Sequence, residues 1–152
     1  MKSALLIGVI AAIIAGIAIS IQSTFSTRVG ALIGPIRTGL FTNVFGGTVA
    51  LVILGATMII PIGEKGDIPS RAALLLFLSG LFGVFIIMGV SFSFQRTGVT
   101  AGSASVILGQ LLISTIIDAS GWGGAEPIPI DFNRILGLIV MAVAVYLLLP
   151  RS

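Results

Sequence analysis

Four polar residues recur at helical spacing in a largely apolar stretch: Ser103, Gln110, Ser114 and Asp118. They fall on one face of a helix, because they lie seven, four and four positions apart and a helical turn takes about 3.6 residues. A polar stripe of this kind is typical of a helix that faces a bundle interior or a water-filled cavity. We expect Gln110 and Ser114 to line such a cavity; interhelical hydrogen bonds, worth about 0.6 kcal/mol each on average, are the alternative for the stripe.

Asp118 is the only carboxylate within or at the edge of the long apolar segments. Its two possible roles are an ion pair near a helix end, with Arg28 or Arg134, and a site for a proton or cation, and we favour the ion pair. Gln22 and Asn43 are polar residues of other apolar segments, for which cavity lining and interhelical hydrogen bonding stay equally open. The substrate-binding candidates are therefore Gln22, Asn43, Ser103, Gln110, Ser114 and Asp118.

Composition excludes most other chemistry. The 152 residues include no cysteine and no histidine, so thiolate ligands, disulfides and the usual general base are missing. No acidic pair lies inside the apolar segments, and we expect no catalytic residue, no metal and no cofactor. With 57% hydrophobic and only 9% charged residues, against about 25% in soluble domains, the chain is an integral membrane protein. A soluble enzyme and a nucleic-acid-binding protein are both poor interpretations.

A membrane-spanning helix needs about 20 mostly apolar residues, and five segments meet or nearly meet this length. They are Ser3–Phe25, Thr38–Ile60, Ala72–Phe94, Val99–Ile117 and Phe132–Leu149. Pro61–Gly63 ends the second segment, Gln95–Gly98 forms a tight turn, and Asp131 can cap the fifth. We therefore expect an all-α membrane protein, a single transmembrane domain over residues 1–152 built as a bundle of five helices.

Basic residues are divided evenly between the two sides of such a bundle. With five spans, Lys2, Lys65, Arg71 and Arg134 share one side, and Arg28, Arg37, Arg96 and Arg151 share the other. Orientation normally follows an excess of Lys and Arg in the cytoplasmic loops, and four against four gives no excess. A miscounted helix end would explain the balance. The alternative is a chain that inserts in both orientations, or that needs an oppositely oriented partner.

Most of the chain resembles a known family. The stretches IQSTFSTRVGALIGPIRTGLFTNVFGG, GLFGVF, GVTAGSASVILGQLLISTIIDASG and FNRILGLIVMAVAVYLL are similar, in this order, to the YdcZ-like family of the drug/metabolite transporter superfamily. The most specific pieces are Gln22 with Arg28, Gly109–Gln110 with Asp118, and Arg134 with Gly137. The fourth and fifth segments also resemble small multidrug resistance transporters.

Three features depart from these patterns. Ser26 stands where the family often has asparagine, and Ala119–Gly121 stand where it often has His-Phe-Gly. The first segment has no acidic residue, whereas small multidrug resistance transporters use a first-helix glutamate for proton-coupled exchange. That mechanism, and a cationic substrate with it, therefore does not carry over from the resemblance.

The resemblance implies an EamA-like five-helix half-transporter in the cell membrane, in bacteria the inner membrane. Superfamily members often have ten helices in two inverted halves, with the site near the midplane. A lone half would pair as an antiparallel dimer, either with itself or with a homologous half. We expect a transporter of a small molecule or metabolite that works by alternating access at the dimer interface. The alternative is a non-transporting membrane interaction subunit of a larger transporter complex, for which faces of small residues would suffice.

Overall fold

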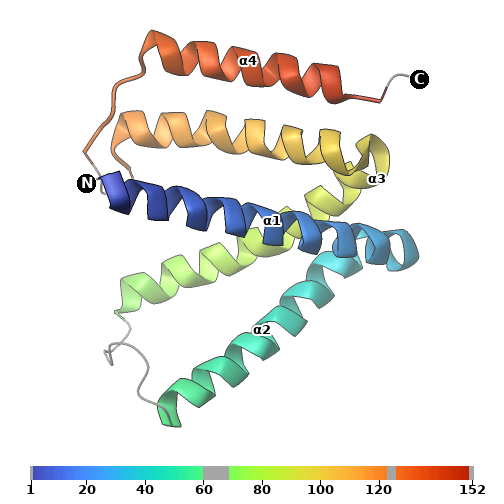
Figure 1. The fold of residues 1–152 in the computed structure, drawn as a ribbon. Helices are drawn as coiled ribbons and strands as arrows, with labels where there is room; N and C mark the ends of the chain where they lie inside the picture. The colour runs from blue at the N-terminus through green and yellow to red at the C-terminus, as the bar shows by residue number, and fades with distance from the viewer. Residues whose placement is uncertain (1, 60–68, 123–125, 151–152) are drawn as a thin grey trace. The chain divides into compact units, whose positions relative to one another are not determined.

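The computed structural model describes residues 2–59, 69–122 and 126–150, and most of these residues are helical. The helices are α1 (Lys2–Ile33), α2 (Pro35–Ile59), α3 (Ser70–Ser120) and α4 (Phe132–Leu148) (Figure 1). No strand occurs among the described residues, which confirms the all-α class. The expected boundary at Pro61–Gly63 lies outside them.

The expectation of five helices is wrong, because residues 2–59, 69–122 and 126–150 form four helical elements. The predicted third and fourth helices are joined in α3, where only Gly98 departs from helical geometry, with φ 76° and ψ 167°. A tight turn was expected over the four residues Gln95–Gly98, but Gly98 alone makes the bend and the other three remain helical. Since side chains clash at these backbone angles, glycine is almost the only residue that adopts them without strain.

The first connection is also shorter than expected. Residues 26–33 continue α1, and Gly34 alone, with φ 86°, separates α1 from α2. Pro35 begins α2, a position that suits proline because the first amides of a helix have no partner within the helix. Ser26 to Arg37 was expected outside the helices, between the segments Ser3–Phe25 and Thr38–Ile60. The one threonine of this range, Thr27, stays helical by bonding back: its Oγ1 donates to the Ser23 carbonyl at 2.8 Å.

The chain divides into two compact units, Met1–Phe92 and Ser93–Ser152. In the first unit, α2 approaches α3 closely at Gly39. A Cβ added there would lie 3.0 Å from the carbonyl oxygen of Val84 and would overlap the Met88 side chain. The Ser91 hydroxyl, fully buried, donates to the backbone carbonyl of Ser26 in α1 at 3.2 Å. A glycine on α2 and a serine on α3 therefore both lie where helices of this unit approach closely.

In the second unit, α3 bends sharply at Gly98. A Cβ on Gly102 would lie 2.8 Å from Cε1 of the Phe94 ring. In a straight helix, residues eight positions apart are about 12 Å apart along the axis, and side chains lean towards the N-terminus, so these two could not meet. We call residues 70–97 the proximal arm of α3 and residues 99–120 the distal arm. Within this unit α4 lies alongside the distal arm (Figure 1).

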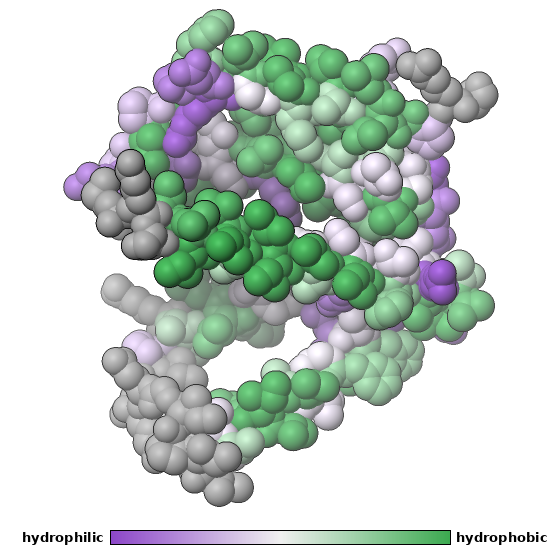
Figure 2. Space-filling view, in the orientation of Figure 1, coloured by the Kyte–Doolittle hydropathy of each residue, from purple (hydrophilic) through white to green (hydrophobic). Residues whose placement is uncertain are grey.

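Apolar side chains cover the outside of the helices rather than a core. Among the described residues, only Phe94, Ala101 and Ala104 are buried hydrophobic residues. Figure 2 shows the N-terminal part of α1 green, where residues such as Leu5, Ile7 and Ile14 are exposed. In length and composition, Leu5–Ile33, Pro35–Thr57 and Ala72–Ser120 could each cross a membrane, and Phe132–Leu148 is apolar but shorter. Such a surface is suited to lipid rather than water.

Candidate functional site

An open groove of about 470 Å³ lies between the distal arm of α3 and α4, within the second unit. Four α3 residues at helical spacing form one wall, and six α4 residues form the other. The lining residues are Leu111, Ser114, Thr115, Asp118, Arg134, Gly137, Leu138, Val140, Met141 and Ala144. Most of this surface is apolar, and the polar groups gather at the end where α3 finishes and α4 begins.

Asp118 is held by the way α3 ends. The Trp122 amide donates to the Ile117 carbonyl at 3.3 Å, and the Gly121 amide donates to the Asp118 carbonyl at 3.4 Å. With Gly121 at φ 65°, this is a Schellman motif, in which glycine ends the helix in the left-handed region. The Ile128 amide also donates to the Asp118 carbonyl at 2.9 Å, so the returning chain is fastened to the same turn.

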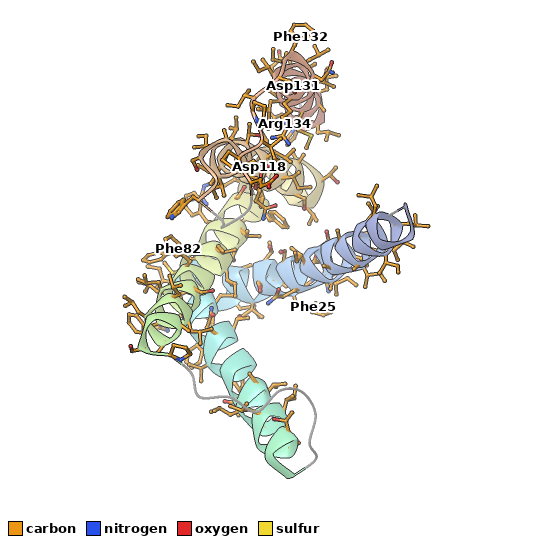
Figure 3. The ribbon with its side chains drawn as sticks, turned by 90° about the vertical axis from the view of Figure 1, so that its left-hand side faces the viewer. Phe25, Phe82, Asp118, Asp131, Phe132 and Arg134 are labelled. Atoms are coloured by element: carbon orange, nitrogen blue, oxygen red, sulfur yellow. The ribbon has the colours of Figure 1, made fainter. Side chains whose placement is uncertain are left out.

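Arg134 is held by the way α4 begins. Asp131 caps this helix: its Oδ1 accepts a hydrogen bond of 2.9 Å from the Arg134 amide. This confirms the cap expected at Asp131, because a carboxylate at this position satisfies a free amide of the first turn. Figure 3 shows Asp131 and Phe132 at the start of α4, with Arg134 directed towards Asp118.

Asp118 and Arg134 form an ion pair across the groove. Nη1 of Arg134 lies 3.3 Å from Oδ2 of Asp118, and the two side chains are 31% and 46% exposed. Of the two partners expected for Asp118, the structure selects Arg134. An exposed pair with a single contact contributes only about 0–1 kcal/mol to stability.

Each charge of this pair lies where its own helix disfavours it. Asp118 stands in the last turn of α3, where the helix dipole is negative, and Arg134 in the first turn of α4, where it is positive. Charges placed in this way cost about 0.3–1 kcal/mol each at a helix end. An exposed pair with a single contact therefore adds little net stability.

Several polar atoms at this end of the groove remain available to a ligand. Among the described residues, Oδ1 of Asp118, Nη2 and Nε of Arg134 and Oγ of Ser114 make no hydrogen bond. Thr115 differs, because its hydroxyl donates to the Leu111 carbonyl at 2.8 Å. The groove can thus offer a carboxylate acceptor, guanidinium donors and a hydroxyl beside an apolar wall.

The structure brings together only part of the predicted set. Ser114 and Asp118 line the groove, whereas Ser103, half-buried, and Gln110, exposed, lie on the distal arm outside its lining. Gln22 is exposed on α1 of the first unit. Asn43, also in the first unit, donates from Nδ2 to the Gly39 carbonyl at 2.8 Å, and its Oδ1 faces Gly83 of α3.

The α4 wall was not foreseen as a lining surface. Arg134, Gly137, Met141 and Ala144 recur at intervals of three or four, the spacing of one helix face, and this signal is present in the sequence. No group of three or more His, Cys, Asp or Glu residues that could hold a metal ion occurs in the part of the chain that the structure describes.

Comparison with known proteins identifies the family. The family model described as "Putative inner membrane exporter, YdcZ" matches residues 7–147. No curated protein and no solved structure matches the chain. The matched residues include both walls of the groove and most of each of the four helices. The family description, an exporter of the inner membrane, agrees with helices that are apolar enough to cross a membrane. The chain therefore belongs to the YdcZ family of drug/metabolite transporters, and it is an integral, multi-pass membrane transporter rather than an enzyme.

Proposed function

We propose that the protein exports a small molecule through the groove between the distal arm of α3 and α4. The observation that carries this proposal is the partly satisfied Asp118–Arg134 pair at the end of an apolar groove. A helix pair that served only for packing would gain little from an exposed ion pair placed against both helix dipoles. An exporter needs polar groups that can break their contacts within the protein and bind the substrate instead. Of the predicted substrate-binding residues, we assign Ser114 and Asp118 to this groove.

We further propose that each arm of α3 crosses the membrane. Ala72–Ser120 has 49 residues and would measure about 74 Å as a straight helix, more than twice the hydrocarbon thickness of about 30 Å. With the bend at Gly98, the distal arm measures about 33 Å, which is enough for one crossing. The even division of basic residues calculated from the sequence then still applies, with the two units forming one transmembrane domain.

Alternating access at an antiparallel dimer completes the proposal. Within Phe132–Leu148 no residue is buried, so α4 has surface to offer to a partner. The balance of four against four basic residues supports two opposite orientations. Two inverted halves with a site between them are a recurring design of secondary transporters.

The test is to fill the groove. Gly137 lines the groove and has no atom within 4 Å of an added Cβ, so Gly137→Phe adds a ring there without displacing backbone. Gly109→Phe is the matched control, because Gly109 is equally open but lies outside the lining. Cells that produce the wild type, either variant or no protein are compared by the small molecules released into the medium.

We expect the wild type and Gly109→Phe to release at least one compound that Gly137→Phe retains. Equal amounts of the three proteins in the membrane exclude a difference in expression. If Gly137→Phe releases the same compounds as the wild type, the groove is not the export route.

A further inference from the structure

The polar end of the groove presents two opposite charges on separate helices. The single contact of 3.3 Å between Nη1 of Arg134 and Oδ2 of Asp118 leaves Oδ1 on one side and Nη2 and Nε on the other. A guanidinium has five N–H donors, so most of its donors are available to a ligand. The Ser114 hydroxyl, four residues before Asp118, adds a neutral donor and acceptor on the same helix face.

A ligand with one charge would satisfy only half of this arrangement. An anion would take Arg134 and leave Asp118 without its partner, and a cation would do the reverse. Separating the two charges without giving both of them new partners loses their mutual attraction, and this loss weakens binding. A ligand that carries an ammonium and an acidic group satisfies both residues, and the net charge of the site stays zero.

The rest of the groove is suited to an apolar body. Leu111 lines the α3 wall, and Leu138, Val140, Met141 and Ala144 line the α4 wall. Methionine adapts its shape to different apolar groups. A volume of about 470 Å³ falls in the range of small-molecule sites, about 300–1,000 Å³.

From these observations we infer that the groove binds an amphipathic zwitterion: a head group with an ammonium and an acidic group between Arg134 and Asp118, and a short apolar body along α4. The inference rests on the proposed function, because it assigns the substrate class of the same groove. A free apolar amino acid and the ethanolamine phosphate head group of a lipid share this chemistry, and separate probes distinguish the two sources.

The test uses three ligands with the same apolar body: leucine, a zwitterion; leucinamide, a cation under mildly acidic conditions; and 4-methylpentanoate, an anion. Binding to the full chain is measured by calorimetry in nanodiscs that contain phosphatidylcholine and phosphatidylglycerol but no phosphatidylethanolamine. A fourth ligand, lysophosphatidylethanolamine, represents the lipid source.

We expect at least one zwitterion, leucine or the lysolipid, to bind about tenfold more tightly than either singly charged analogue, a ratio that corresponds to about 1.4 kcal/mol. Whichever of the two binds identifies the source. Asp118→Asn and Arg134→Gln should each reduce this binding about tenfold. Glu126→Gln and Arg37→Gln, which remove exposed charges outside the groove, should not change it.

Two results would overturn the inference: a singly charged analogue that binds as tightly as the zwitterions, or zwitterion binding that survives both variants. The ligand series on the wild-type chain requires no variant to fold. If the zwitterion preference is absent while Gly137→Phe still blocks release, the substrate class is wrong and the export route stands. If Gly137→Phe has no effect, the proposed function itself fails.

Discussion

The placement of single charges separates residues that hold this fold from residues that can serve a ligand. Asp131 lies at the positive end of α4 and bonds the Arg134 amide, which is a stabilising arrangement. Asp118 and Arg134 lie at the wrong ends of their helices and meet through one exposed contact. Asp131 therefore stabilises a helix end. Asp118 and Arg134 are positioned by the caps around them, and each can give up its contact with the other to contact a ligand instead.

Replacing Arg134 tests this distinction. Arg134→Gln should lower the free energy of unfolding by no more than about 1 kcal/mol, because the pair is half-exposed. It should reduce export by about tenfold or more, because the groove loses its only guanidinium. The measurements are thermal unfolding in detergent and release of a compound found with the wild type.

Arg37→Gln serves as the control, since it removes an exposed arginine of the first unit. A strongly destabilised Arg134→Gln whose folded fraction exports normally would show that the ion pair is a structural clamp.

Residue spacing predicted the site only in part. A helix turns by about 100° per residue, so the distal arm has one face that carries its four groove-lining residues, Leu111, Ser114, Thr115 and Asp118. Gln110 lies about 90° from the centre of that face, which is why the polar stripe extends beyond the groove. Ser114 and Asp118 could therefore be found from the sequence. The choice between Arg28 and Arg134 as the partner of Asp118 depends on how the chain returns after Gly121, which spacing does not determine.

At the scale of the helices, glycines decide where the chain turns and where helices approach. The last helix was predicted to within one residue, Phe132–Leu149 against Phe132–Leu148, because Asp131 and the preceding prolines mark its start. The first connection was predicted too long, because threonine and serine hydroxyls can bond within a helix as well as in a loop. The third and fourth helices were predicted as separate elements, whereas they are joined in α3, because one glycine, Gly98, is sufficient for the bend.

Gly98→Ala should destabilise the bend. Its φ of 76° with ψ of 167° is a conformation that residues with a Cβ adopt at a cost of about 1–3 kcal/mol. We expect a lower unfolding temperature and reduced export. Gly109→Ala, in the helical part of the distal arm with open space around it, should be neutral or slightly stabilising. Equal unfolding temperatures for the two variants would contradict the role assigned to Gly98.

Gly39→Ala tests the close approach of α2 to the proximal arm of α3. The added methyl group meets the Val84 carbonyl oxygen and the Met88 side chain, and backbone atoms cannot move aside cheaply. We expect a loss of about 1–3 kcal/mol in unfolding free energy. Gly46→Ala, seven residues later on α2 in open space, is the matched control and should change stability by less than about 0.5 kcal/mol. A Gly39→Ala variant as stable as this control would mean that the two helices are not in contact.

At the scale of the whole molecule, the proposal depends on orientation in the membrane. Four basic residues on each side leave orientation undecided if each arm of α3 crosses once. Adding two lysines after Arg151 should shift the population to the orientation with the C-terminus in the cytoplasm, as measured with reporters fused at that end. The variant with two added glutamines is the control. One fixed orientation in the unmodified chain, without an oppositely oriented partner, would contradict the antiparallel dimer.

The central claim is that the groove between the distal arm of α3 and α4 is a substrate path open to water, and its most direct test is chemical labelling. The chain has no cysteine, so Ser114→Cys introduces a single thiol in the groove. A membrane-impermeant maleimide is applied to vesicles, with Ile139→Cys, exposed on α4 outside the groove lining, as the control. The account predicts that Ser114→Cys reacts in the intact membrane while Ile139→Cys reacts only after denaturation. If Ser114→Cys is as unreactive as Ile139→Cys, the groove faces lipid and the account is contradicted.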